Sequence, residues 1–301
     1  MATPYHEGEL AVQARAGVRD MASKIGSGIH AEIPPAAREF LRGRRFAVLA
    51  SVDAAGAVWA SLLAGPPGLL DAPDAHTLAL AASPAAGDPL AVTLRSGAAI
   101  GLVAVDFATR RRMRLNGTVV EAAAGTVRVR ATQVYANCPK YIQRRELAAD
   151  AAALPAPAAV RHGAGLGDAE RAWIEAADTF FVASAHPAAG ADASHRGGAP
   201  GFVRVIDART LRWPDYAGNT MFQTLGNFAV NPSAGLLFVD FERGATLQLT
   251  GRARVLWDDA EQAGYAGAER LVEFQVDRWI EIAGHVPRGW RFIDYSPFNP
   301  A

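Results

Sequence analysis

The sequence has little of what marks several large classes of protein. Cys138 is its single cysteine, which excludes an intrachain disulfide and a metal cluster built from cysteines. Thirty basic residues are balanced by thirty acidic ones, so we expect neither nucleic acid nor an anionic membrane as a partner. No apolar run reaches the roughly 18 residues of a membrane-spanning helix. The amphipathic N-terminal segment lacks the basic start and apolar block of a signal peptide, so we expect a cytoplasmic protein.

Metal sites and nucleophile–base pairs also lack their usual spacing. The seven histidines are scattered without the short intervals typical of metal ligands, so no metal site is expected. Ser194 and His195 are neighbours, and neighbouring residues of a strand point to opposite faces, which argues against their acting as a nucleophile and its base. No other side chain is an obvious acid or base, so the catalytic residues stay unknown.

What the sequence does contain is an internal repeat. At 301 residues, half of them apolar, the chain has room for two domains, each with its own core. Identical residues recur 133 positions apart and, further along, 134 positions apart, which one inserted residue explains. The matching pairs include Ser51 and Ser184, Ser61 and Ser194, Gly65 and Gly198, Asp74 and Asp207, Gly101 and Gly235, Asp106 and Asp240, Leu115 and Leu249, and Gly117 and Gly251. We therefore divide the chain into copy one, residues 1–150, and copy two, residues 151–301.

The two copies predict the same order of elements. A helix (34–41 or 168–177) leads into an apolar strand (46–51 or 180–184), then come an antiparallel strand pair (100–107 with 112–121, or 235–241 with 245–255) and a closing strand (126–135 or 273–282). Short strands with turns every 8–12 residues are typical of a barrel. The predicted fold is mainly β with flanking helices, in two tandem barrels. The stretch 151–160, rich in alanine and proline, reads as the linker between them.

The copies differ in their charged residues. Where copy two has Arg196, copy one has Leu63, and where copy two has Arg204, copy one has Asp71. Copy two therefore holds two arginines on a strand and its approach that copy one has lost. We expect copy one to bind no phosphate of its own.

Copy two also carries polar side chains at the start of a predicted helix, residues 221–230. Asn219, Gln223 and Thr224 lie there, and a helix N-terminus offers free N–H groups and the positive end of a dipole. An arginine can hold two phosphate oxygens at once. Taken alone, a strand arginine is more often solvated or ion-paired, and Asn219 could be a turn or N-cap residue. Their occurrence together in one copy favours a phosphate site.

Several runs of residues resemble the pyridoxamine 5′-phosphate oxidase-like flavoproteins, and more narrowly the uncharacterised FMN-binding branch of that family. In copy two they are residues 180–184, 194–205, 218–219, 225–227, 231–232, 235–238 and 247–251, and elsewhere residues 6–10 and 137–143. The resemblance covers most of the chain. In copy one it rests mainly on the repeat and on the segment 137–143.

The resemblance implies split β-barrels of about six antiparallel strands, with FMN in a groove where two barrels meet. Carried over, the phosphate contacts are Arg196 or Arg204 together with Asn219, Gln223 and Thr224. The sequence departs from the family at Gln223-Thr224, where the vitamin B6 oxidases have an Arg-Lys pair, which puts the substrate in doubt. Lys140 and Tyr141 could reach across to the flavin. The barrels would pair either within one chain, as a pseudo-dimer, or between two chains, as a homodimer.

The resemblance thus favours an FMN-binding oxidoreductase with a small-molecule electron donor or acceptor and an unknown substrate. A non-catalytic protein that binds or senses a flavin or haem is the alternative, and a scaffold that has lost its ligand is a third. Within the enzyme class, a deazaflavin cofactor stays open.

Overall fold

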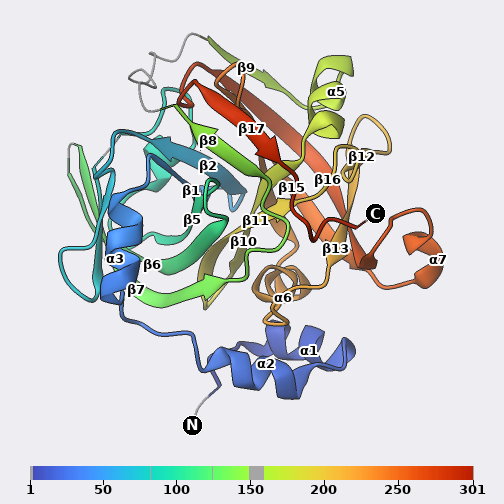
Figure 1. Cartoon of the computed structure of the whole chain (residues 1–301), viewed down its shortest axis with the longest axis horizontal. Helices are drawn as coiled ribbons and strands as arrows, with labels where there is room; N and C mark the ends of the chain where they lie inside the picture. Colours follow the sequence, from blue (N-terminus) through green and yellow to red (C-terminus); the bar gives the residue numbers. More distant parts are fainter. Residues whose placement is uncertain (1–2, 82, 124, 149–158, 301) are drawn as a thin grey trace.

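The computed structural model of the chain describes residues 3–81, 83–123, 125–148 and 159–300, which form two split β-barrels side by side (Figure 1). The first barrel has the strand order β2-β1-β5-β6-β7-β4-β3 and the second β11-β10-β14-β15-β16-β13-β12, so the order is the same once equivalent strands are matched. The bounds in the first barrel are β1 (Phe46–Val52), β2 (Val58–Ala64), β3 (Leu70–Asp71), β4 (Thr77–Leu80), β5 (Ala99–Asp106), β6 (Arg111–Ala123) and β7 (Thr126–Asn137). Those in the second are β10 (Thr179–His186), β11 (Gly190–Gly197), β12 (Arg204–Val205), β13 (Thr210–Tyr216), β14 (Ser233–Asp240), β15 (Ala245–Leu256) and β16 (Ala268–Ala283), with β9 (Ala159–Gly163) added beside β16.

Helices and one small sheet complete the two units. Helices α3 (Pro35–Arg42) and α5 (Asp168–Ala176) precede the first strand of each barrel, and α6 (Gln223–Val230) lies below the junction of the barrels in Figure 1. The N-terminal helices α1 (Glu7–Arg15) and α2 (Arg19–Gly26) lie under α6, so the start of copy one covers copy two. The remaining elements are α4 (Leu90–Thr93), α7 (Asp259–Gln262), and the pair β8 (Arg144–Leu147) and β17 (Trp290–Asp294). Within the described residues, no helix has both the length and the apolar character needed to cross a bilayer.

The barrels share a core because β1 and β10 bury both faces. Side chains alternate along a strand, so Leu49 of β1 points into its own barrel while Val48 meets Phe181 and Ala183 of β10 between the barrels. Burying a valine or phenylalanine side chain contributes roughly 1.5–3 kcal/mol, so this shared core holds the copies together. The copies therefore pair within one chain as a pseudo-dimer.

Two equivalent glycines allow the barrels to approach closely. A Cβ on Gly101 of β5 would lie 2.5 Å from Cα of Asp192 in β11, and a Cβ on Gly235 of β14 would lie 2.8 Å from Cα of Trp59 in β2. Backbone atoms that close leave no room for a side chain, so both positions require glycine. The contact at Gly101 brings Asp192 of copy two against copy one, where the site described below begins.

The structure confirms the mainly β, two-barrel fold expected from the sequence. The helix expected at 221–230 begins two residues later, at Gln223, because Thr220 and Phe222 adopt left-handed φ angles of 59° and 61° that interrupt helical geometry. Of the expected linker 151–160, residues 151–158 lie outside the described residues and the last two begin β9. The division of the chain at residue 150 therefore stays a prediction.

Candidate functional site

A cavity of about 430 Å³, here called the inter-barrel cavity, lies at the start of α6. Both copies and the N-terminal segment contribute to its wall. Its polar lining includes Arg114 of β6, Arg196 of β11, Asp215 of β13, Asn219, Thr220, Gln223 and Thr224 around the start of α6, and Glu269 and Arg270 of β16. Val18 and Met21 close it from the side of α2.

Three arginines around the inter-barrel cavity are held by buried carboxylates. Arg114 donates to Asp192 at 3.0 Å across the two copies, Arg196 donates to Asp215 at 2.8 Å, and Arg270 lies 3.4 Å from the second oxygen of Asp215. The ion pairs fix the guanidinium groups but do not use all of their N–H groups. In the described part of the chain, the buried Nε of each of these arginines has no hydrogen-bond partner. An anion in the cavity would satisfy such donors.

The start of α6 is an uncapped helix N-terminus facing this cavity. Its N-cap residue is Phe222, whose side chain cannot accept from the first-turn N–H groups, and no side-chain cap is present. Asn219 instead accepts from the N–H of Met221 at 3.2 Å, which shapes the preceding turn. Thr224 hydrogen-bonds Ser194 at 3.1 Å. The free N–H groups and the positive dipole end favour a bound anion here.

A smaller space of about 70 Å³, here called the side cavity, adjoins the inter-barrel cavity and shares Arg114, Arg196 and Asn219 with it. Arg112, Cys138, Tyr141 and His195 line the rest. Arg112 lies 2.9 Å from Nδ1 of His195 and 4.0 Å from the Cys138 sulfur. Burial lowers the pKa of Arg112 to about 10, and burial together with Arg112 holds the pKa of His195 well below its usual value. The imidazole is therefore neutral beside a charged guanidinium.

The structure brings together most of the residues singled out in the sequence. Arg196, Asn219, Gln223 and Thr224 line the inter-barrel cavity, and Gln223 lies against the sulfur of Met221 at 3.1 Å. Tyr141 lines the side cavity, with its hydroxyl donating to the carbonyl of Ala217 at 3.0 Å.

Arg204 and Lys140 lie elsewhere. The guanidinium of Arg204 is exposed, stacks 4.0 Å from the ring centre of Tyr265 and donates to the carbonyl of Gly264. The ammonium of Lys140 lies 5.7 Å from the ring centre of Phe298. Neither residue lines either cavity, because β12 and the turn after β7 direct these side chains to other surfaces.

Sequence reasoning missed the residues that copy one contributes. Arg112 and Arg114 lie two positions apart on β6 and so point to the same side, toward copy two. At the repeat offset of 134, copy two has Thr246 and Gln248 in their place. The same comparison that revealed Arg196 would have found these arginines if charges lost from copy two had also been sought. Asp215 carried the same signal as Arg196, since copy one has Ala82 at the offset of 133, whereas Arg270 lies beyond the matched pairs.

The pseudo-symmetric position on the other side of the junction, here called the closed site, is filled. Trp59, which is 1% exposed, occupies the position equivalent to Asp192, and Leu63 replaces Arg196 within the first core. Asp88 accepts from Ser61 at 2.6 Å and from Gln248 at 2.7 Å. Burial raises the pKa of Asp88. A buried carboxyl without a basic partner disfavours an anion at the closed site.

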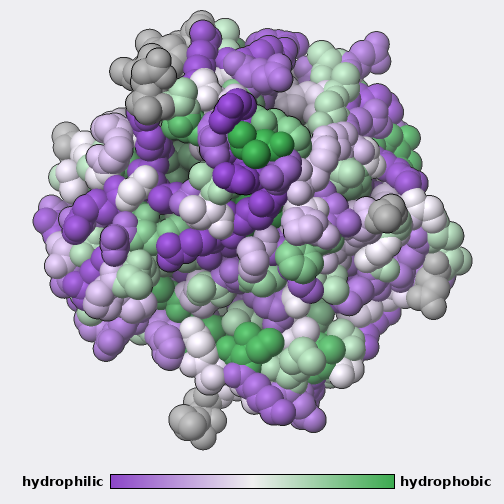
Figure 2. Space-filling model, viewed as in Figure 1, coloured by the Kyte–Doolittle hydropathy of each residue, from purple (hydrophilic) through white to green (hydrophobic). Residues whose placement is uncertain are grey.

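Another cavity, of about 650 Å³, lies away from the barrel junction, between α5 and β17. Figure 2 shows a small apolar patch ringed by hydrophilic side chains over β17, where Phe292 is exposed. The arginines that line this cavity are already paired: Arg145 with Asp178, Arg161 with Glu281, and Arg243 with Asp240. Its remaining lining charges are acidic, so size alone does not make it an anion site.

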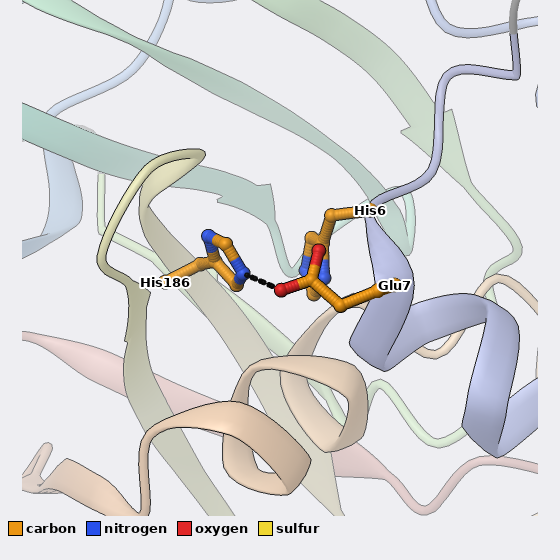
Figure 3. A group of neighbouring side chains, drawn as sticks. All are labelled: His6, Glu7 and His186. Atoms are coloured by element: carbon orange, nitrogen blue, oxygen red, sulfur yellow. Dashed lines mark hydrogen bonds and ion pairs between the residues drawn. The ribbon is translucent and has the colours of Figure 1, made fainter.

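Figure 3 shows a separate polar cluster, in which His6, Glu7 and His186 meet where α1 covers copy two. Nδ1 of His6 accepts from the N–H of Gly8 at 3.1 Å, and Nδ1 of His186 accepts from two backbone N–H groups, so each neutral ring carries its proton on Nε2. Those Nε2–H groups donate to Asn227 at 2.9 Å and to Glu7 at 3.0 Å. A metal at Nε2 would require these bonds to break. The geometry is that of a hydrogen-bonded clamp on α1.

Comparison with known proteins identifies a family. The profile of the pyridoxamine 5′-phosphate oxidase family matches residues 33–161 and again 166–283. Among solved structures, HupZ of Group A Streptococcus is 16% identical, with a TM-score of 0.33, over 41% of this chain and 99% of that one. An FAD-binding protein of Mycobacterium smegmatis is 14% identical, with a TM-score of 0.29, over 41% and 99%. An FAD-binding protein of Mesorhizobium loti is 13% identical, with a TM-score of 0.29, over 41% and 98%. The sequence matches no curated protein at a significant level.

Proposed function

The chain belongs to the pyridoxamine 5′-phosphate oxidase family, and on that premise we propose that the inter-barrel cavity binds FMN and that the protein is a flavin-dependent oxidoreductase. One observation carries the proposal: guanidinium groups from both copies converge on the uncapped start of α6, in a cavity of about 430 Å³. That volume lies in the lower part of the range for small-molecule sites, which favours the mononucleotide over the larger FAD.

The residues of the cavity fit a flavin phosphate. Arg196 and Arg270 are held by Asp215 with Nε groups to spare, and α6 presents its first-turn N–H groups to the same space. Thr224 adds a hydroxyl next to them. A phosphate group needs several donors around it, and these residues supply both donors and positive charge. The Arg-Lys pair of the vitamin B6 oxidases is thus replaced by arginines from other strands.

FMN, when bound, supplies hydride or electron transfer to a small-molecule donor or acceptor. The chain's own part is to hold the phosphate, to orient the ring between the barrels and to keep water from it. Val18 and Met21 lie over the cavity from the N-terminal segment, and the clamp of His6, Glu7 and His186 fixes that segment to copy two.

Replacing Arg196 with alanine tests the proposal. Arg196→Ala removes a charged donor, which is worth roughly 1.5–3 kcal/mol, so FMN affinity should fall by at least about tenfold. Asp215 keeps Arg270 as a partner, so the fold should survive. Arg204→Ala is the matched control and should change the affinity by less than about twofold. Fluorescence titration of the apo-protein measures both.

Equal losses in the two variants, or none in Arg196→Ala, would reject the phosphate assignment. The absorbance spectrum of the purified protein decides the cofactor class, because a Soret band would support the haem-binding alternative. Reduction of the yellow protein by NADH or NADPH, followed by reoxidation faster than free FMN, would support the enzyme over a storage or sensing protein.

A further inference from the structure

The side cavity has a charge arrangement that the inter-barrel cavity does not explain. Arg114, Arg196 and Arg270 each have a carboxylate within 3.4 Å. Arg112 has none among the described residues: its contacts are Nδ1 of His195 and the sulfur of Cys138. A half-buried guanidinium with no carboxylate beside it and a buried Nε costs free energy unless an anion is supplied from outside.

The hydrogen bonds leave donors of two residues unused. An arginine can only donate, so the contact between Arg112 and Nδ1 of His195 makes that nitrogen the acceptor. The single proton of the neutral ring is then on Nε2, which is buried and has no partner in the described part of the chain. Nε of Arg112 is likewise buried without a partner. Two buried donors on residues that line one small cavity indicate a missing acceptor.

We propose that the side cavity is a carboxylate subsite, in which Arg112 and His195 bind the carboxylate group of the substrate beside the flavin. Its role in substrate binding rests on the proposed function, since the flavin would occupy the adjoining inter-barrel cavity. The volume of about 70 Å³ suits a group of roughly three or four heavy atoms rather than a second nucleotide. The side cavity joins the larger one at Arg196 and Asn219, so the rest of the substrate can lie against the cofactor.

The repeat supports a specific role for Arg112. Its counterpart in copy two, Thr246, lies 3.3 Å from Nε2 of His285 and makes an uncharged pair there. The same strand position therefore carries a cation only where the barrels leave a cavity. Arg111, the next residue on β6, is exposed and lies 5.3 Å from the ring centre of Phe40 on the other side of the strand.

Acetate and its uncharged isostere acetamide are the probes for this subsite. Saturation-transfer NMR on the full chain, with and without FMN, should show acetate binding at least about tenfold more tightly than acetamide. Arg112→Gln should abolish this preference, and Arg112→Lys should retain part of it, because the charge remains but the planar donor set is lost. Arg111→Gln is the matched control and should leave the preference unchanged. Circular dichroism verifies that each variant is folded.

The outcomes separate this subsite from the proposed function. FMN affinity unchanged within about twofold in Arg112→Gln, with the acetate preference lost, supports both. Acetate preference that depends on Arg112 in a protein that binds no FMN keeps an anion subsite but removes its role beside a flavin. Equal binding of acetate and acetamide, or a preference that survives Arg112→Gln, overturns the subsite whatever the FMN result.

Discussion

The two sides of the barrel junction differ in charge although their backbones are related by the repeat. On the copy-two side, Arg114 is held by Asp192 and Arg196 is held by Asp215. At the closed site, Gln248 reaches across to Ser61 in the way that Arg114 reaches toward copy two. Duplication has thus preserved the geometry of two sites and left the cations at one of them.

The comparison also shows where specialisation occurred. Copy one, which has Leu63 where copy two has Arg196, still supplies Arg112 and Arg114 to its neighbour. Copy two in turn supplies Gln248 to the closed site, where its amide donates to Asp88 and to Ser61. Each copy therefore contributes to both positions, and a change in either copy can open or close a site. The candidate site is therefore a feature of the pair of barrels.

Opening the closed site by Trp59→Ala is the most disruptive way to test the comparison. Removing this buried ring should lower the free energy of unfolding by about 4 kcal/mol. Space alone should not create a flavin site, because Leu63 and Gln248 bring no charge. Urea denaturation measures the first effect, and FMN titration should still give the stoichiometry of the unmodified chain. A second bound flavin would show that shape, and not charge, distinguishes the two sides.

Arg114 of β6 can be replaced by glutamine, the residue that β15 has at the equivalent position, Gln248, and this change makes the inter-barrel cavity resemble the closed site. Arg114→Gln leaves the carboxylate of Asp192 buried without a charged partner, with the uncharged donors Tyr135, Asn116 and Thr224 around it, so stability should fall by about 3 kcal/mol and FMN affinity with it. Asp192→Asn in the same chain should restore much of the stability without restoring the affinity. Unchanged FMN affinity in Arg114→Gln would mean that copy one does not contribute to the cofactor site.

The smallest effect concerns the carboxyl group of the closed site. Because burial raises the pKa of Asp88, the folded chain retains a proton that the unfolded chain releases, so stability should fall as pH rises from the usual aspartate pKa through the raised one. Asp88→Asn removes this proton exchange and should flatten that fall. Urea unfolding between about pH 4 and pH 8 measures the slope. An unaltered slope in Asp88→Asn would contradict the uncharged character of the closed site.

Much of the fold follows from local sequence patterns that occur in both copies. Gly117 and Gly251 are equivalent in the repeat, and each lies at a shift in strand register, Gly117 where β6 pairs with β7 and Gly251 where β15 pairs with β16. Strands such as β1 and β10 are apolar enough to predict in isolation. The start of α6 could not be placed to the residue, because nothing in the local sequence predicts a positive φ at Phe222, a conformation rare for a bulky side chain.

Only some of the residues of the candidate site could be predicted from the sequence. Arg196 and Thr224 could be found because copy one has lost their counterparts, and the geometry places both at the inter-barrel cavity. Arg204 matched by the same criterion but lies on Tyr265, since the comparison of copies reports charge and not direction. Arg114 of copy one becomes a neighbour of α6 only when the barrels pair. No local pattern encodes that contact.

The amount of FMN bound per chain tests the central claim most directly. Equilibrium dialysis of the purified chain, with FMN quantified by absorbance and protein by amino-acid analysis, should give one flavin per chain at saturation. That result follows if a single junction site, built by both copies, has retained its cations. Two flavins per chain, or none under conditions where the chain is folded, would contradict it.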